Sequence, residues 1–162
     1  MAEDILFKFN NFMFSYRVGG ILIHENKILL QKPPNDEYAI IGGHVQAFED
    51  SAQTLEREFF EELHTCIKAE NLIAIGEIFF PWGERPCHQI SLYYNVSLAG
   101  TVSIPLEGVF HGYDDLGGER IDLDFCWVPL DDLNSLTVYP TELIPHITAN
   151  NGGMLHFISR QI

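Results

Sequence analysis

The chain has 162 residues, 46 % of them hydrophobic, and its 23 Asp and Glu outnumber its 9 Lys and Arg to give a net charge of −14. A chain of this length and composition can fill one ordinary core, so we expect a single domain over residues 1–162. The acidic balance argues against a surface that binds nucleic acid and against docking on anionic membranes, because both need a basic patch. An anionic substrate would therefore need metal ions to mediate its binding.

Cysteine usage and the N-terminus both favour the cytoplasm. Cys66, Cys87 and Cys126 are odd in number and lack a metal-ligand spacing, so we expect buried, reduced thiols. The opening residues MAEDILFKF are acidic where a secretory signal would be basic. In addition, no apolar run approaches the roughly 20 residues that span a bilayer.

The N-terminal part of the chain predicts strands. An aromatic-rich segment at 7–14 has the composition of a strand, which its two asparagines bulge or turn. Apolar residues recur through 16–24 and 27–31, which predicts a strand pair with a short polar connection. Residues 33–36, two prolines followed by Asn and Asp, predict a surface turn.

A glycine pair and a helix follow. Gly42 and Gly43 allow backbone conformations that are closed to other residues, so we expect a turn there. Asp50 and Gln53 have the spacing of a capping box, which predicts a helix that begins near Ser51. At 100° per residue, the apolar side chains of this helix share one stripe, which consists of Ala52, Leu55, Phe59, Phe60 and Leu63.

Three carboxylates, Glu58, Glu61 and Glu62, cluster beside that stripe. Like charges three and four residues apart repel by roughly 0.2–0.5 kcal/mol per pair, so the cluster favours a cationic partner. Mg²⁺ prefers oxygen ligands and is commonly held by one or two carboxylates together with substrate phosphates. The alternative is a solvated acidic face that only Arg57 offsets locally. Spacing alone leaves both interpretations open.

The stretch 42–67 resembles the Nudix box, the signature of the Nudix hydrolases. The family pattern is Gly, five residues, Glu, seven residues, Arg-Glu, apolar, any, Glu-Glu, any, Gly, apolar. The positions that match in register are Gly43, Glu49, Arg57, Glu58, Phe59, Glu61 and Glu62. His64 replaces the closing Gly, Thr65 occupies the apolar slot, and Ile41 stands where Pro often precedes the glycines. No carboxylate is lost, and His tolerates the left-handed C-cap conformation better than most residues, though less well than Gly.

Beyond the helix, segments 72–80 and 88–98 predict two longer strands, joined by a loop that carries Trp82 and Arg85. Phe80 and Trp82 are able to stack on a base, although aromatic side chains that simply cover a sheet face are more common. Arg85 is a candidate phosphate contact or, equally, a solvated loop arginine.

A second acidic segment lies in the C-terminal half. Residues 111–120 are acidic and punctuated by glycines, which predicts a loop. Asp122 and Asp124 then alternate with apolar residues at strand period, so both acids should share one face. Residues 127–133 resemble the strand and short helix that come late in Nudix domains. The remaining predicted elements are a helix at 140–149 and a final strand at 154–159.

Strands on both sides of the box helix, with another helix near the end, predict the α/β class. The specific expectation is an α/β/α sandwich around a central mixed β-sheet, which the Nudix resemblance also implies. The same resemblance implies hydrolysis of a diphosphate linkage in a nucleoside diphosphate linked to another moiety, with Mg²⁺ or Mn²⁺ as cofactor.

The resemblance also implies roles for the box residues. Glu58 and Glu62 would be the first metal ligands, and the Gly42 carbonyl a further one. Glu61 would be a ligand or the general base. Arg57 would orient the acids.

Two further acids lie outside that cluster. Glu49 is implied to support the metal site, and it also complements the dipole at the start of the helix. Nudix hydrolases often recruit one acid from a loop after the box, and Glu119, which follows a Gly-Gly pair, is the first choice here. The alternative is that Glu119 belongs to a solvated acidic loop.

A second function stays open: a Nudix-like module that binds a nucleotide without cleaving it. Such modules usually lose acids of the box, whereas this sequence keeps them all. Either reading implies a small-molecule nucleoside diphosphate derivative as partner, and a homodimer is compatible with both.

Overall fold

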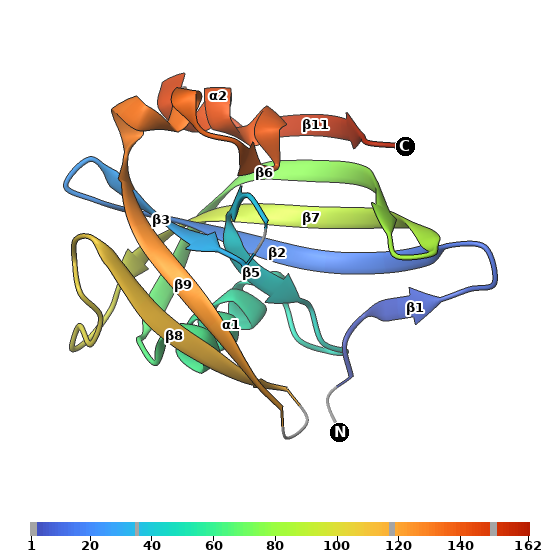
Figure 1. Ribbon diagram of the computed structural model, residues 1–162, viewed down its shortest axis with the longest axis horizontal. Coiled ribbons are helices and arrows are strands. Elements are labelled where there is room, and N and C mark those ends of the chain that lie inside the picture. The colour runs from blue at the N-terminus through green and yellow to red at the C-terminus, as the bar shows by residue number, and fades with distance from the viewer. Residues whose placement is uncertain (1–2, 35, 117–118, 150–151) are drawn as a thin grey trace.

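The computed structural model describes residues 3–34, 36–116, 119–149 and 152–162 (Figure 1). The helices are α1 (Ser51–Leu63), α2 (Ile144–Ala149) and the 3-10 helices η1 (Leu130–Ser135) and η2 (Thr141–Leu143). The strands are β1 (Leu6–Lys8), β2 (Met13–His24), β3 (Lys27–Lys32), β4 (Tyr38–Ala39), β5 (Ile41–His44), β6 (Ile67–Trp82), β7 (Arg85–Leu98), β8 (Val109–Leu116), β9 (Glu119–Pro129), β10 (Val138–Tyr139) and β11 (Leu155–Arg160).

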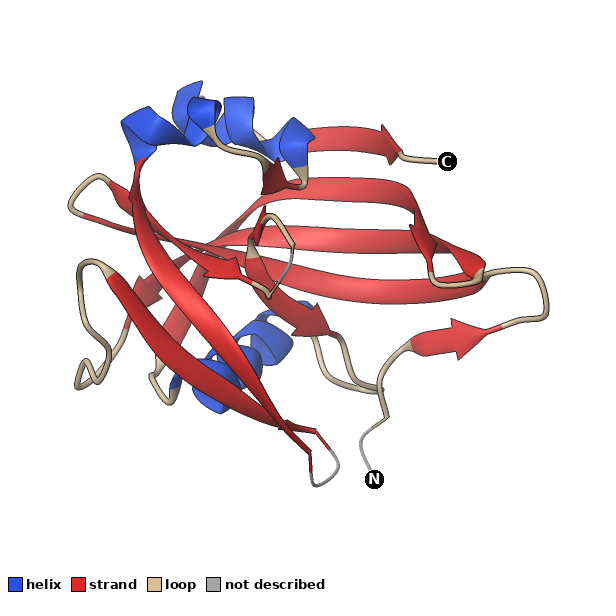
Figure 2. Ribbon diagram, viewed as in Figure 1, coloured by secondary structure: helices blue, strands red, loops and turns tan. Residues whose placement is uncertain are grey.

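The described strands form one mixed sheet with the order β10-β4-β3-β2-β7-β6-β11. Strands β1 and β5 both pair with β2, and the β8–β9 hairpin joins the sheet through β3. The pairs β2·β7, β6·β11 and β4·β10 are parallel. Figure 2 shows the strands between α1 on one side and the segment from η1 to α2 on the other. The predicted α/β/α sandwich with a central mixed sheet is confirmed.

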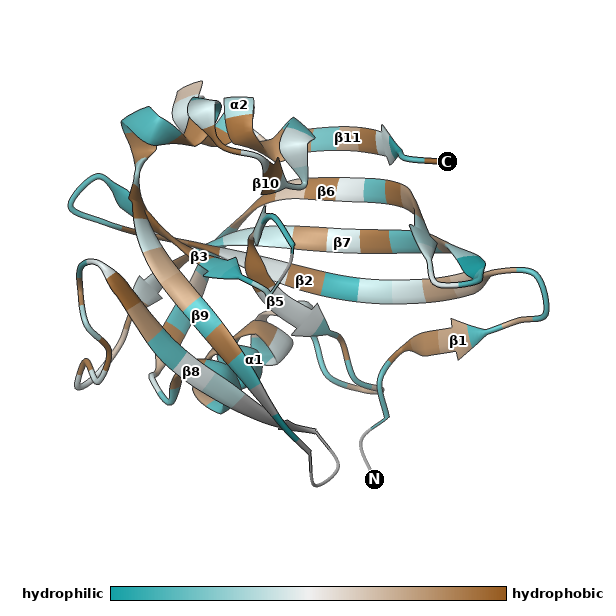
Figure 3. Cartoon of the chain, viewed as in Figure 1, coloured by the Kyte–Doolittle hydropathy of each residue, from teal (hydrophilic) through white to brown (hydrophobic). Residues whose placement is uncertain are grey.

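Two apolar clusters fill the space on the two sides of the sheet. Val18, Phe59 and Phe125 belong to the cluster beneath α1, and Ile21 and Ile147 to the cluster beneath α2. Full burial of one such side chain contributes about 1.5–3 kcal/mol. Along β9, hydropathy alternates from residue to residue in Figure 3, because successive side chains of a strand point to opposite faces. The core thus fixes which side of each strand faces α1.

Several predicted strands are confirmed with small changes in their bounds. The segment at 7–14 splits into β1 and the start of β2, and its two asparagines form the connection. Glu25 and Asn26 join β2 to β3 with φ angles of 49° and 60°, as a tight turn between paired strands requires. Asp122 and Asp124 lie on the exposed face of β9 while Leu123 between them is buried.

The predicted loop at 111–120 is wrong over its described residues, because they belong to β8 and β9, which pair with each other. Strand β8 is bonded only to β9, and its Gly112 makes a close approach, because a Cβ there would lie 2.8 Å from the Phe125 ring and 2.9 Å from the Glu62 carbonyl oxygen. The loop predicted between 80 and 88 is likewise mostly strand, since Trp82 pairs with Arg85 at the hairpin end. The helix predicted at 140–149 is shorter: η2 comes first and α2 begins at Ile144.

The cysteines differ in their burial. Cys87 is buried and Cys126 partly buried, but Cys66 is exposed, so the expectation of three buried thiols is wrong for Cys66. Burial raises the pKa of the Cys87 and Cys126 thiols. Among the described residues, no helix is both long and apolar enough to cross a bilayer.

Candidate active site

Helix α1 carries the acidic cluster and has the ends that its sequence predicts. The Asp50 carboxylate accepts from the Gln53 N–H at 2.8 Å, and the Gln53 side chain accepts from the Asp50 N–H at 3.0 Å. At the other end, His64 adopts the left-handed conformation, with φ 53° and ψ 33°, and its N–H donates to the Phe60 carbonyl. One detail of the predicted stripe is wrong, because Phe60 is 56 % exposed. The cap therefore forms with His where Gly is usual.

The two glycines of β5 are not a turn, because neither has a positive φ and both lie in a strand paired with β2. A Cβ on Gly43 would overlap the Glu58 carboxyl group and lie 2.6 Å from its Oε2 atom. A Cβ on Gly42 would overlap the Val18 carbonyl oxygen and lie 2.9 Å from the Gly19 Cα. Glycine is required here for close approach, since any side chain at 43 would displace Glu58.

Arg57 organises the carboxylates around it. It binds Glu49 through two nitrogens, Nε at 2.9 Å and Nη2 at 3.0 Å, in the forked geometry that suits a carboxylate. Its Nη1 atom donates to Glu58 at 2.9 Å and to Glu61 at 3.1 Å, and Nη2 also donates to the His44 carbonyl at 3.2 Å. One guanidinium thus binds Glu49, which precedes α1, and two acids of α1 itself, and it also ties them to β5 through the His44 carbonyl.

Glu58 is the most perturbed of these acids. Burial raises its pKa to about 7, and the neighbouring charge of Glu61 adds to the rise, while Arg57 opposes it. Glu62 is 6 % exposed, so a second carboxylate of the helix is also withdrawn from water. By contrast, Glu61 is exposed. Carboxylates that are costly to charge in this way would be stabilised by a cation beside them.

The donor set suits a hard divalent cation, because carboxylate and carbonyl oxygens are the ligands that Mg²⁺ prefers. Within the described ranges, no three His, Cys, Asp or Glu side chains already stand together as a metal-binding group. Arg57 binds one oxygen each of Glu58 and Glu61. The residues fit a divalent metal, which would bind the carboxylate oxygens that Arg57 does not hold.

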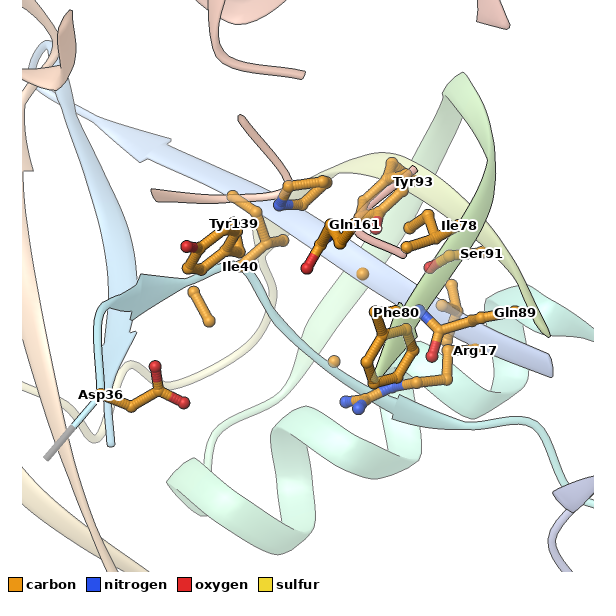
Figure 4. Close-up of a pocket in the computed structure, with 15 residues that line it drawn as sticks. Arg17, Asp36, Ile40, Ile78, Phe80, Gln89, Ser91, Tyr93, Tyr139 and Gln161 are labelled. Atoms are coloured by element: carbon orange, nitrogen blue, oxygen red, sulfur yellow. The ribbon is translucent and has the colours of Figure 1, made fainter. Parts of the chain in front are cut away.

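A cavity of about 400 Å³ lies on the other side of the glycine pair. Gly42 lines it, whereas the neighbouring Gly43 faces Glu58, as alternation along a strand dictates. Figure 4 shows Arg17, Phe80 and Gln89 on one side of the cavity and Asp36 and Tyr139 on the other. The further lining residues include Ile40, Ile78, Ser91, Tyr93 and Gln161. An organic group of moderate size can thus lie across β5 from the acidic cluster.

A family model described as NUDIX domain matches residues 13–147. The chain belongs to the Nudix hydrolase family. Solved Nudix structures share its fold at low sequence identity. An ADP-ribose pyrophosphatase from Streptococcus suis is 17 % identical over 88 % of this chain and 98 % of its own, with a TM-score of 0.57. A MutT protein from Methanosarcina mazei is 18 % identical over 89 % and 99 %, with a TM-score of 0.59. A Nudix hydrolase from Nitrosomonas europaea is 16 % identical over 95 % and 82 %, with a TM-score of 0.59. No curated protein matches the chain.

In this Nudix hydrolase, ring contacts extend one wall of the cavity. Trp82 stacks on Phe80 with ring centroids 5.9 Å apart, and on its other neighbour His44 at 6.1 Å. Burial, and then the charge of Arg17, lower the pKa of His44 to about 4, against a small opposing effect of Asp4. His44 is therefore neutral near pH 7, and its buried Nε2 atom makes no hydrogen bond to the described residues.

The predicted substrate residues of the Nudix hydrolase are separated by the fold. Phe80 lines the cavity, whereas Trp82 contacts it only through Phe80. Arg85 ends the β6–β7 hairpin and is not among the lining residues. Glu119 is the first residue of β9, and its side chain lies outside the described part of the chain.

Sequence reasoning missed Arg17, Gln89, Ser91 and Gln161, which come from β2, β7 and the residues after β11. Only the parallel pairing of β2 with β7, between residues more than seventy positions apart, brings Arg17 opposite Ser91. One local signal existed, because Ser15 and Arg17 are polar residues at strand period on a strand that is mostly apolar.

Proposed function

We propose that this Nudix hydrolase cleaves a diphosphate linkage in a nucleoside diphosphate linked to another moiety, with Mg²⁺ or Mn²⁺ as cofactor. The observation that carries the proposal is the position of β5 between the acids and the cavity. Gly43 leaves room for the Glu58 carboxylate, and the adjacent Gly42 lines the cavity. A substrate whose organic part fills the cavity would present its diphosphate at the glycine pair, within reach of the carboxylates.

The metal would be held by Glu58, Glu62 and Glu61, with the Gly42 carbonyl as a further ligand. A bound divalent cation neutralises charge on the diphosphate and lowers the pKa of a bound water. Arg57 keeps Glu58 and Glu61 directed towards β5 through its bonds of 2.9 and 3.1 Å. These contacts support a positioning role for Arg57.

Proton transfer needs a carboxylate that the attacking water can reach. Glu61 is exposed and stands at the edge of the cluster, which supports it as the general base. Glu119 remains the second candidate, as an acid supplied from the β8–β9 hairpin. Glu49 is instead fully engaged by Arg57 and by the Thr54 hydroxyl at 2.6 Å, which supports a structural role at the start of α1.

The cavity would take the base or the second moiety of the substrate. Phe80, extended by Trp82, offers a flat apolar wall for a ring. Arg17 supplies a cation inside the cavity and is the better placed phosphate contact, with Arg85 the more distant alternative. The similar Streptococcus suis protein is named an ADP-ribose pyrophosphatase, which supports this class of substrate.

A substrate screen tests the proposal. Nucleoside triphosphates, nucleotide sugars, ADP-ribose, dinucleoside polyphosphates and NADH are incubated with the chain and Mg²⁺, and released monophosphate or phosphate is measured. We expect hydrolysis of at least one compound that bridges a nucleoside and a second moiety through a diphosphate. The absence of cleavage of all these compounds by a folded protein would contradict it.

A further inference from the structure

A row of rings crosses five strands on the α1 side of the sheet. Phe7 on β1 stacks with Phe14 on β2, with ring centroids 6.4 Å apart. Phe14 and His88 on β7 make an edge-to-face contact with centroids 6.1 Å apart. The ring centroids of His88 and Phe79 on β6 lie 4.5 Å apart, and the Arg160 guanidinium of β11 lies 4.5 Å from the centre of the Phe79 ring. Each contact joins cross-strand partners, so the row follows the pairing register from one edge of the sheet to the other.

A second row lies beside the first, two residues further along each strand. It consists of Tyr16, Ile90, Glu77 and Ile158, which are partners in the same register. We call these two rows, from Phe7 to Arg160 and from Tyr16 to Ile158, the ladder face. Helix α1 covers the sheet further along, where Ser51 bonds the Tyr94 hydroxyl at 2.7 Å. Figure 1 shows the right-hand ends of β2, β7, β6 and β11 extending past α1.

The two sides of these strands differ sharply in burial. On the opposite side, the side chains that alternate with the ladder face are buried, among them Met13, Cys87 and Ile78. On the ladder face, Phe7 is 51 % and Ile158 is 54 % exposed, and the residues between them are partly exposed. A sheet side that carries aromatic and branched apolar residues in this state has no covering layer in the described chain.

The β1–β2 hairpin enlarges this apolar surface. Phe9 and Phe12 continue the register that pairs Phe7 with Phe14, stack at 4.6 Å, and are 47 % and 41 % exposed. With Ile158, the exposed phenylalanines leave about 400 Å² of apolar surface, since side chains of this size bury roughly 150–250 Å² each. This is within the range of about 300–600 Å² for the largest patch on a monomer, and it is half of the roughly 800 Å² that one partner contributes to a standard interface.

The ladder face carries few of the acidic side chains of the protein, which favours contact with a second copy of the same acidic chain. The chain has 23 acidic side chains against 9 basic ones, yet Glu77 is the one acid in the two rows. The His156 Nε2 atom lies 2.7 Å from its carboxylate. Arg160 stands at one end of the first row and the exposed Phe7 at the other. Two copies of an acidic chain can therefore meet here without bringing their acidic surfaces together.

We infer that the ladder face is the contact surface of a homodimer formed by two copies of this chain. A two-fold axis along β7 over His88 sets Arg160 of one copy against Phe7 of the other and Phe79 against Phe14. The Arg160 guanidinium of each copy then contacts the Phe7 ring of the other, and Phe79 of each copy contacts Phe14 of the other. The same surface thus serves both copies, as a two-fold interface requires. The two sheets pack face to face at about 10 Å, the usual spacing of stacked sheets.

Sedimentation of the full chain over a wide range of concentration tests the inference without any substrate. We expect a dimer whose dissociation constant rises about tenfold or more in Ile158→Glu, because two carboxylates then enter an apolar contact. Val109→Glu is the matched control, since Val109 is also a branched apolar residue on a strand, is 69 % exposed, and lies outside the ladder face. Its dissociation constant should equal that of the unmodified chain.

Hydrogen exchange of the unmodified chain supplies a second measurement that needs no variant. Raising the concentration should protect amides of β1 and β11 but not those of β8. A chain that stays monomeric at every concentration, or a dimer that both substitutions leave equally intact, would overturn the inference. Association with lipid vesicles in place of a dimer would overturn it as well.

Discussion

The alanine variant of Gly43 tests the link between the glycine pair and the acidic cluster. The added Cβ would overlap the Glu58 carboxyl group and lie 2.6 Å from Oε2, well inside a normal contact. Because the added Cβ takes the space of that carboxyl group, which Arg57 otherwise holds at 2.9 Å, the Glu58 side chain must move away from Gly43. The variant therefore moves one proposed metal ligand without changing its chemistry.

The effect on stability should be small, because two contributions oppose each other. Losing the 2.9 Å bond between Arg57 and Glu58 costs about 1.5–3 kcal/mol. Releasing Glu58 from burial offsets this loss, because burial is the largest cause of the rise in its pKa to about 7. The free energy of unfolding of metal-free Gly43→Ala should thus change by no more than about 1–2 kcal/mol.

Turnover should fall by about a hundredfold or more, because displacing a reacting group by an ångström has effects of that size. The assay is kcat on the best substrate, alongside thermal unfolding. Gly20→Ala is the matched control, since its Cβ would meet the Phe59 ring at 2.8 Å in the core. That variant should lose stability and keep its turnover. If folded Gly43→Ala retains turnover within about threefold, Glu58 has no role beside Gly43 and the reasoning fails.

Three further predictions concern the cavity and the acids around it. Arg17→Ala should raise KM about tenfold or more with kcat nearly unchanged, and Arg85→Ala should raise it less; the reverse order in steady-state kinetics would make Arg85 the phosphate contact. Glu119→Gln should lower kcat at saturating substrate about tenfold, whereas Asp114→Asn should not, and equal small effects would remove Glu119 from the site. His44→Phe should reduce the loss of stability between pH 6.5 and 4: burial lowers the pKa of His44 to about 4, so the folded protein resists the proton that the unfolded chain takes up as pH falls. Denaturant unfolding measures the free energy of unfolding at each pH, and its change over this range should differ between the two proteins by up to about 3 kcal/mol, less after solvent screening. If the free energy of unfolding depends on pH equally in both proteins, His44 does not titrate in this way.

The box and its helix could be predicted from the sequence because their determinants are local. The capping box of Asp50 and Gln53, the apolar stripe and the spacing of the glutamates all lie within one stretch. Even the unusual His64 cap follows from the small set of residues that tolerate a left-handed conformation. Local signals of this kind survive whatever the rest of the fold does.

The cavity could not be predicted, because it depends on pairings between distant segments. Arg17 and Ser91 become neighbours only through the parallel pairing of β2 with β7. The role of Gly43 was also hidden, since a glycine needed for close approach looks in a sequence like a glycine needed for a turn. Finally, the glycines around 111–120 suggested a loop, but Gly112 lies in strand β8, where it leaves room for the Phe125 ring and the Glu62 carbonyl oxygen.

Direct metal binding is the measurement closest to the central claim, that the carboxylates of α1 hold a divalent cation beside the cavity. Free Mn²⁺ is followed by electron paramagnetic resonance as the unmodified chain, Glu62→Gln and Glu56→Gln are titrated. Glu62 is buried within the cluster, whereas Glu56 is exposed on the same helix, where it accepts from the Ala69 N–H at 3.5 Å. We expect Glu62→Gln to weaken Mn²⁺ binding by about tenfold or more and Glu56→Gln to leave it unchanged. Equal binding by all three proteins would place the metal elsewhere and contradict the account.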